Sequence, residues 1–468
     1  MIPVSLSWVV EQVKGELISV DNADVTIQGV STDTRTIAPE DLFIALVGPN
    51  YDGHKFVGQA QQLGATAVIV SKQLETDVTQ ILVQDTTVAL GLLGAAVKAK
   101  VAPKTVAITG SSGKTTVKEM IAAILSRRGK VLATKGNFNN EIGVPLTLLR
   151  LTKDDEFAVI ELGANHLGEI AYTTNLVKPD VATIVNAAAA HLEGFGSLLG
   201  VARAKSEIFK SLSDKGLAIL NADSQFYAFW QGKLRTHNVQ TFSTEKAANF
   251  TAGDVILGLD GCAQFELQTP KGNISVSLSL PGMHNVSNAL VAAGLAMSLG
   301  ATLQDVKEGL RLMPHVAGRL EVKQLTNQVK IVDDSYNANV ASVNVAIDLL
   351  GSFAGRKVLV LGDMGELGDK ARYYHEKVGE YALQKGIDEL FTLGVLSQSA
   401  SEIFNQKGKH FDQMENLVAH INERLICEQR DISILVKGSR SAHMERVVVA
   451  LEDSPVGKFV RIRERIAC

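Results

Sequence analysis

Residues 107–116 read AITGSSGKTT, and this stretch decides the fold at the centre of the chain. A short apolar run, residues 105–109, precedes the glycine-rich segment. From residue 117 to residue 125 apolar side chains recur at i, i+3, i+4, i+7 and i+8, which predicts one apolar stripe of a helix. The segment therefore predicts a buried strand, a tight loop and a helix N-terminus, an arrangement that binds phosphate through free backbone N–H groups and the helix dipole.

The loop is shorter than the usual phosphate-binding loop. The standard form is G-x-x-x-x-G-K-[ST], whereas Gly110 and Gly113 are three positions apart and Ile108 stands where the first glycine would fall. Lys114 would add positive charge at the terminal phosphates, and the Thr115 hydroxyl would bind Mg²⁺. A glycine turn with a solvent-facing lysine is the alternative, and the flanking strand and helix favour the nucleotide site.

Composition and charge exclude several classes of protein. The chain has 468 residues, which favours roughly two to four domains over one core. A formal net charge of −4 and a hydrophobic content of 46% indicate a globular protein without a nucleic-acid or anionic-membrane partner. Cys262, Cys427 and Cys468 are too widely spaced to indicate disulfides or a zinc site. Without a signal-peptide pattern or a membrane-length apolar run, a cytoplasmic enzyme is expected, a monomer by default.

The pattern along the chain predicts an α/β protein with three domains. Residues 1–84 mix short strands with two helical stretches, as a small α/β unit does. Residues 85–315 alternate strands and helices, which predicts a parallel sheet covered on both faces, and residues 254–280 alternate as antiparallel β-structure does. Residues 316–468 restart the α/β rhythm in a Rossmann-like unit whose strands end in glycine, where ligand loops are expected. Strands are predicted at 25–30, 42–47, 67–70, 81–83, 105–109, 157–162, 181–185 and 217–220, and a helix at 287–298.

Polar residues follow the predicted strands of the middle region. Glu161 ends an apolar strand at the edge where sheet ligands bind, which suits a second bond to Mg²⁺, although a glutamate can also simply cap a strand. His191 lies in a glycine-flanked loop after the next strand, where it is as often structural as a ligand, and His166 is equally ambiguous. By pattern alone, Lys205 resembles an ordinary lysine on a helix surface.

Nine short segments occur in the order of one known family. They are GSSGKTT (110–116), KGNFNNEIGVPLTLL (135–149), ELGANHLGEI (161–170), AHLEGFGS (190–197), KSEIF (205–209), PGMHNVSNALVAA (281–293), GR (318–319), DDSYNAN (333–339) and VKGSR (436–440). Together they resemble the Mur ligases of bacterial cell-wall synthesis, in which the shortened loop is usual. The resemblance covers essentially the whole chain.

Within this family the chain is most similar to the members that add D-alanyl-D-alanine to UDP-N-acetylmuramoyl-tripeptide. The members that add the third residue of the peptide share the N-terminal pattern STDTR…DLFIALVG…YDGHKF. Those that add meso-diaminopimelate, however, carry a D-N-P-R motif, and no such string occurs here. Whether the tripeptide ends in meso-diaminopimelate or lysine stays open.

The resemblance implies ATP and two Mg²⁺ ions, and it assigns roles to particular residues. For ATP the implied residues are Gly110, Ser111, Ser112, Gly113, Lys114, Thr115, Thr116, Asn288, Arg319, Asp334, Tyr336 and Asn337. For the metals they are Thr115 and Glu161 at one ion, and His191 and a carbamylated Lys205 at the other. For the substrates they are Ser31, Thr34 and Arg35 at the uridine diphosphate, Asn139 and Asn140 at the sugar or peptide, and Lys437, Ser439 and Arg440 at the dipeptide carboxylate.

Each assignment has a plainer alternative, and so does the function. Arg35 could pair with Asp33, Asp334 could cap a helix, and Lys437 could be a solvated loop residue. A folate-polyglutamate-type ligase would share the phosphate loop and the third domain, but the N-terminal STDTR unit argues against it. A phosphate-loop ATPase acting as a switch or motor would need an aspartate where the strand offers Glu161.

Overall fold

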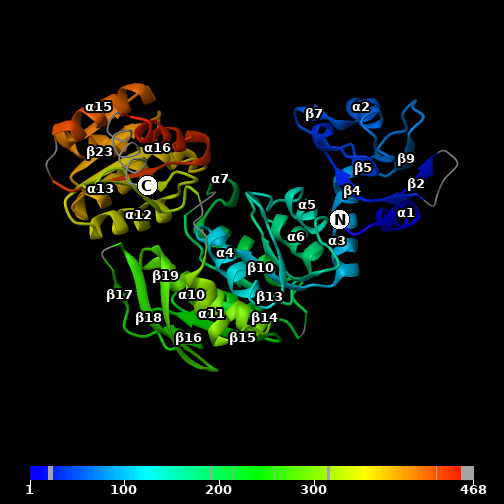
Figure 1. The fold of residues 1–468 in the computed structure, drawn as a ribbon, viewed down its shortest axis with the longest axis horizontal. Coiled ribbons are helices and arrows are strands. Elements are labelled where there is room, and N and C mark those ends of the chain that lie inside the picture. Colours follow the sequence, from blue (N-terminus) through cyan, green and yellow to red (C-terminus); the bar gives the residue numbers. More distant parts are fainter. Residues whose placement is uncertain are drawn as a thin grey trace, which may run out of the picture.

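The computed structural model shows three lobes, with the middle lobe between the two terminal lobes (Figure 1). Each lobe is built on one large sheet, so the predicted α/β class is confirmed. The described residues are 1–18, 25–189, 192–213, 215–258, 260–313, 317–427 and 430–454. Within these ranges none of the helices is both long and apolar enough to cross a membrane.

The N-terminal lobe contains a five-stranded sheet that is parallel except for its edge strand β2. In sheet order its strands are β2 (Glu16–Ile18), β9 (Thr79–Leu82), β8 (Ala67–Val70), β5 (Asp41–Ile44) and β4 (Gly29–Ser31). Two small pairs add β1 (Val4–Ser5) with β3 (Thr26–Ile27), and β6 (Val47–Gly48) with β7 (Tyr51–Asp52). The helices are α1 (Leu6–Val13) and α2 (Val57–Gln62).

Two of the predictions for this lobe are wrong, because a stretch predicted as one strand forms two separate strands in each case. The stretch 25–30 divides at Gln28, whose N–H donates to the carbonyl of Glu40, so that β3 and β4 join different sheets. The stretch 42–47 divides because the N–H of Leu46 donates back to the carbonyl of Ile44, which turns the chain between β5 and β6. The apolar residues correctly indicated that these two stretches contain β-structure. Where each strand ends was decided by backbone hydrogen bonds, one to a residue distant in the sequence and one within a local turn.

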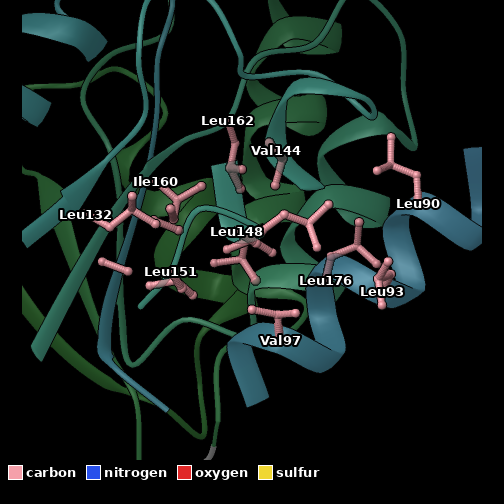
Figure 2. Close-up of a cluster of buried hydrophobic side chains, with 14 of the residues drawn as sticks. Leu90, Leu93, Val97, Leu132, Val144, Leu148, Leu151, Ile160, Leu162 and Leu176 are labelled. Carbon is pink, nitrogen blue, oxygen red and sulfur yellow. The ribbon is translucent and has the colours of Figure 1, made fainter. Parts of the chain in front are cut away.

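Helix α3 (Thr86–Val101) joins the N-terminal lobe to the middle lobe. The Asp85 side chain caps it by accepting from the N–H groups of Thr87 and Val88. Leu90, Leu93 and Val97 of α3 pack against side chains of the middle lobe (Figure 2). The labelled partners are Leu132, Val144, Leu148, Leu151, Ile160, Leu162 and Leu176. One continuous core therefore spans the two lobes.

The middle lobe contains a ten-stranded sheet. Its strands run in the order β11 (Lys130–Ala133), β12 (Asp155–Glu161), β10 (Lys104–Thr109), β13 (Val181–Ile184), β14 (Leu217–Asn221), β15 (Asn238–Ser243), β16 (Phe250–Ala252), β18 (Cys262–Thr269) and β17 (Ile256–Leu257), with β19 (Gly272–Pro281) also paired to β18. The first seven are parallel, and β17, β18 and β19 pair antiparallel, so the predicted antiparallel segment is confirmed as an extension of the same sheet.

Helices cover both faces of this sheet, as predicted. They are α4 (Lys114–Leu125), α5 (Gly143–Leu148), α6 (Glu169–Val177), α7 (Leu192–Phe195), α8 (Leu198–Lys205), α9 (Tyr227–Lys233), α10 (His284–Ser298) and α11 (Leu303–Arg311). Along β10, Val106 and Ile108 face the core under α4 and α10, whereas Ala107 faces the core under α3 and α5. The helix predicted at 287–298 is confirmed, and it begins three residues earlier, at His284.

The C-terminal lobe contains a six-stranded sheet that is parallel except for β20. The order is β20 (Glu321–Gln324), β21 (Val329–Asp334), β25 (Ile432–Lys437), β22 (Arg356–Gly362), β23 (Glu389–Leu393) and β24 (Gly408–Phe411). The helices are α12 (Val340–Ser352), α13 (Ala371–Gln384), α14 (Gln398–Glu402), α15 (Met414–Cys427) and α16 (Glu445–Glu452). Glycine stands at or directly after the ends of β22, β23 and β25, as predicted, so ligand loops can leave this edge.

Candidate active site

The predicted phosphate loop joins β10 to the N-terminus of α4. Gly113 caps the helix with φ of +75°, a left-handed conformation, and a Cβ there would lie 3.0 Å from Oδ1 of Asn288. Both constraints favour glycine at this position. The Nζ of Lys114 donates to the carbonyl of Gly110 at 2.8 Å, which holds the lysine over its own loop.

Asn186, which the sequence did not single out, fixes the backbone of this short loop. Its Oδ1 accepts from the N–H groups of Ser111 and Ser112, at 3.1 and 3.0 Å, and its Nδ2 donates to the carbonyl of Ser112 at 3.1 Å. Asn186 follows β13, which pairs with β10, and therefore lies beside the loop. The only signal for Asn186 in the sequence was a polar residue directly after the strand predicted at 181–185.

We expect Asn186→Ala to raise the KM for ATP by about tenfold, since each lost hydrogen bond contributes about 1 kcal/mol to holding the loop. Asn186→Asp keeps the acceptor but removes the donor and adds a negative charge, so it should weaken ATP binding further. Steady-state kinetics at varied ATP measure both. An unchanged KM in both variants would contradict this role.

The predicted metal ligands Thr115 and Glu161 lie together. Thr115 Oγ1 donates to Glu161 Oε2 at 2.8 Å, and both residues are buried. The register of the sheet explains the contact, because Glu161 is opposite Ile108 at the end of β10. Asn139 Nδ2 donates to the other carboxylate oxygen at 2.9 Å. A hydroxyl and a carboxylate in one buried spot are hard oxygen donors, so these side chains fit Mg²⁺.

Lys205 is buried, so its interpretation as a helix-surface lysine is wrong. It ends α8 and is 2% exposed. Burial, and secondarily the positive charge of Lys114, hold the pKa of Lys205 well below its usual range. Burial also lowers the pKa of Lys114, against the opposing effects of Glu161 and Glu366. The two lysines therefore repel each other at the loop, and the amine of Lys205 tends toward its neutral form. His191 lies outside the described residues.

Residues of the C-terminal lobe close over the loop. Arg319 Nη2 donates to Thr115 Oγ1 at 3.0 Å, and its guanidinium lies 4.5 Å from the ring centre of Tyr336. Asn339 Nδ2 donates to the carbonyl of Ser111 at 3.2 Å. The third lobe thus contacts both ends of the phosphate loop.

Asp334 and Lys437 form a buried ion pair at the end of the third sheet. They are opposite each other on β21 and β25, and Lys437 Nζ also donates to the carbonyl of Asn337 at 2.9 Å. Burial raises the pKa of Asp334, although Lys437 and Arg319 act in the opposite direction. Lys437 is 2% exposed, so the alternative of a solvated loop residue is excluded.

A cavity of about 230 Å³ lies between the middle and C-terminal lobes. The residues predicted for ATP or metal that line it are Ser111, Ser112, Gly113, Lys114, Thr115, Thr116, Glu161, Asn288, Arg319, Asp334, Tyr336 and Asn337, and the predicted dipeptide residue Lys437 joins them. The lining also includes residues that the sequence reasoning missed: Asn186, Asn221, His284, Asn285, Asn339 and Ser342. Burial and the charge of Lys437 lower the pKa of His284 to about 4, so this imidazole is neutral near pH 7.

Other predicted residues lie elsewhere. Asn140 Oδ1 accepts from the N–H of Gly143 at the start of α5. In the N-terminal lobe, Ser31 is the last residue of β4 and is buried, and its Oγ donates to the carbonyl of Asp33. Arg35 forms a bidentate pair with Asp33, as its plainer alternative expected, and this hydrogen bonding lowers the pKa of Asp33 to about 2. The Arg35 side chain is nevertheless 85% exposed, so it faces solvent.

Together, the fold and the site define an enzyme of the phosphate-loop class with three lobes, in which the third lobe contributes side chains to the nucleotide loop. Family models match three stretches of the chain: Mur ligase family, catalytic domain, over residues 26–127; Mur ligase middle domain over residues 108–296; and Mur ligase, glutamate ligase domain, over residues 318–440. The chain belongs to the Mur ligase family.

The similarity to known proteins, in sequence and in structure, extends over nearly the whole chain. A UDP-N-acetylmuramoyl-tripeptide–D-alanyl-D-alanine ligase from Escherichia coli (strain K12) is 49% identical over 97% of this chain and 99% of that protein. A crystal structure of MurF from Acinetobacter baumannii has a TM-score of 0.92 at 37% identity, over 97% of this chain and 99% of that one. MurF ligase from Thermotoga maritima in complex with ADP has a TM-score of 0.81 at 29% identity, over 91% of this chain and 97% of that one.

Proposed function

We propose that this chain joins D-alanyl-D-alanine to UDP-N-acetylmuramoyl-tripeptide through an amide bond and converts ATP to ADP and phosphate, in the synthesis of peptidoglycan precursors. The observation that carries the proposal is the meeting of Lys114, the Thr115–Glu161 pair and Arg319 at one cavity between two lobes. Relatives named for this reaction match 97% of the chain, including the N-terminal lobe that distinguishes the competing functions. We also propose that the enzyme acts in the cytoplasm, as expected from the sequence.

The chemistry must activate a carboxylate, because a carboxylate is a poor electrophile. The peptide's terminal carboxylate attacks the γ-phosphorus of ATP, which gives an acyl phosphate and ADP. The amine of D-alanyl-D-alanine then attacks the acyl carbon, and the tetrahedral intermediate expels phosphate. Lys114 offsets the negative charge that gathers when a carboxylate approaches a triphosphate. Closure by Arg319 and Asn339 excludes water that would otherwise hydrolyse the acyl phosphate.

The metal sites follow from the same residues. Thr115 and Glu161 would hold one Mg²⁺, and His191 with a carbamylated Lys205 would hold a second. When bound, the ions would neutralise phosphate charge. Asn139 orients Glu161 through its amide, which keeps one carboxylate oxygen directed at Thr115.

Carbamylation of Lys205 is supported by its burial, since only a neutral amine reacts with CO₂. We expect the wild-type enzyme incubated with ¹³C-labelled bicarbonate to show a carbamate signal in its NMR spectrum. Because burial lowers the lysine pKa, the neutral fraction, and with it the signal, should rise with pH and be present near pH 8. Lys205→Ala should lack the signal and lose most ligase activity. A wild-type enzyme without the signal would refute the modification.

The test of the function is the dependence of phosphate release on both substrates. We expect ATP turnover only when UDP-N-acetylmuramoyl-tripeptide and D-alanyl-D-alanine are both present. Turnover independent of both would favour a switch ATPase, and turnover with folate and glutamate would favour the folate-type ligase.

Product masses from paired incubations with the meso-diaminopimelate and lysine tripeptides would identify the third residue of the tripeptide that this enzyme uses. Size-exclusion chromatography with light scattering would test the expected monomer.

A further inference from the structure

We infer that Lys118, a buried lysine of α4, positions Glu161 for Mg²⁺ by holding the carbonyl group of Thr134. Lys118 does not line the cavity between the lobes, so it acts through Thr134 and is a positioning residue rather than a catalytic one. The inference rests on the proposed function, because it takes Glu161 as a ligand of Mg²⁺.

The side chain of Lys118 links α4 to the end of β11. Lys118 lies four residues after Lys114, where α4 packs on β11 and β12, and it is 1% exposed. Its Nζ lies 2.7 Å from Oε1 of Glu119 and donates to the carbonyl of Thr134 at 2.6 Å. Burying an ammonium group is costly unless it is both paired and hydrogen-bonded, and these two contacts supply both.

Thr134 connects this lysine to the backbone of Glu161. Thr134 directly follows β11 and is buried. Its N–H donates to the carbonyl of Val159 at 3.1 Å, which continues the pairing of β11 with β12. Its Oγ1 accepts from the N–H of Glu161 at 3.0 Å. The three polar groups of Thr134 therefore have partners, one on α4 and two on β12.

The loop that begins at Thr134 also reaches the carboxylate of Glu161. Asn139, in this loop, donates its Nδ2 to Oε1 of Glu161 at 2.9 Å. The other carboxylate oxygen accepts from Thr115 at 2.8 Å. Glu161 is thus held at its N–H and at both carboxylate oxygens. Lys118 anchors the peptide unit from which the loop starts, so loss of this anchor should disturb the contacts of Glu161 with Thr134 and Asn139.

Positioning matters here because Mg²⁺ requires near-ideal octahedral geometry with short bonds to oxygen. Loss of a group that orients a metal ligand typically lowers metal affinity or activity by about 10- to 100-fold. The charge of Lys118 would act in the opposite direction, since removal of a nearby cation favours the binding of another cation. Weaker metal binding after removal of Lys118 would therefore report lost positioning and not lost charge.

The test replaces the ammonium group and measures metal binding directly. Lys118→Met keeps the apolar length of the side chain and removes the donor. We expect its affinity for Mn²⁺, measured by electron paramagnetic resonance with saturating ADP, to fall about 10- to 100-fold. Lys118→Arg keeps a donor and should recover most of the affinity. Lys130→Met removes the same charge at an exposed position on β11 and is the matched control, with unchanged affinity. Thermal melting shows whether each variant is folded.

A second variant tests the same link without removing the lysine. Thr134→Val removes the hydroxyl that accepts from the N–H of Glu161, so it should also weaken Mn²⁺ binding. Combined with Lys118→Met, its effect should be smaller than in the wild-type background, because both changes act through Thr134. In ligation assays Lys118→Met should need more Mg²⁺ and regain most of its kcat at excess Mg²⁺. Its KM for D-alanyl-D-alanine should change less than about twofold.

Unchanged or tighter Mn²⁺ binding in a folded Lys118→Met would overturn the inference. Equal losses in Mn²⁺ affinity and in the KM for D-alanyl-D-alanine would overturn it as well, because they would indicate a general structural defect. If Lys118→Met does not fold, full-strength Mn²⁺ binding by Thr134→Val would have the same consequence. Glu161→Gln tests the proposed function separately: if this variant binds Mn²⁺ as wild type does, the assignment of Glu161 to the metal is refuted.

Discussion

Replacing Lys114 with alanine is expected to lower kcat/KM for ligation by about 10²- to 10³-fold, the loss typical when one preorganised group that stabilises developing charge is removed. Lys114 directs its Nζ to Gly110 at the loop that would hold the phosphates, and its pKa is perturbed by both lobes. The reaction places a carboxylate next to a triphosphate, so loss of this cation should raise the barrier to the first step. Single-turnover measurement of ADP formation isolates that step.

The fold of Lys114→Ala should remain intact. The side chain makes one hydrogen bond, to its own loop, and its partly desolvated ammonium contributes nothing favourable to folding, as the lowered pKa shows. Lys153→Ala, at an exposed position in the same lobe, is the matched control and should retain full activity. Retained ligation in Lys114→Ala would refute the role of this lysine.

Lys437→Met is expected to destabilise the third lobe by about 3–5 kcal/mol, because it leaves the carboxylate of Asp334 buried without its ion-pair partner. Both residues end adjacent strands of the sheet, so the local effect should appear in β21 and β25. Hydrogen exchange of the backbone amides in these strands measures the loss of protection. ATP binding should weaken as well, since both side chains line the cavity.

A second replacement distinguishes the buried charge from a general packing defect. Asp334→Asn in the Lys437→Met background removes the unpaired charge, so the double variant should be more stable than Lys437→Met alone. Lowering the pH should also stabilise the single variant. Burial already raises the pKa of Asp334. In the variant without Lys437, protonation of this carboxyl group would remove the charge that has lost its ion-pair partner. Equal stability of the single and double variants would contradict the ion-pair explanation.

Local sequence determined the nucleotide loop of this protein. The apolar strand, the two close glycines and the helix stripe after Thr116 placed β10 and α4 correctly, since these features depend on residues within one short segment. Glu161 was predicted for the same reason, because a carboxylate at the end of a buried parallel strand lies at the edge where ligands bind. The order of nine motifs was sufficient to indicate the family.

Only the tertiary structure decided which distant residues meet at that loop. Asn186 clamps the loop because β13 pairs with β10, and Arg319 reaches Thr115 because the third lobe closes over the middle one. The helical pattern around Lys205 did not show that this lysine is buried, because its burial comes from other elements that pack on α8. Spacing within a segment follows from local geometry, whereas burial, pairing of charges and contact between lobes depend on how segments pack across the whole chain.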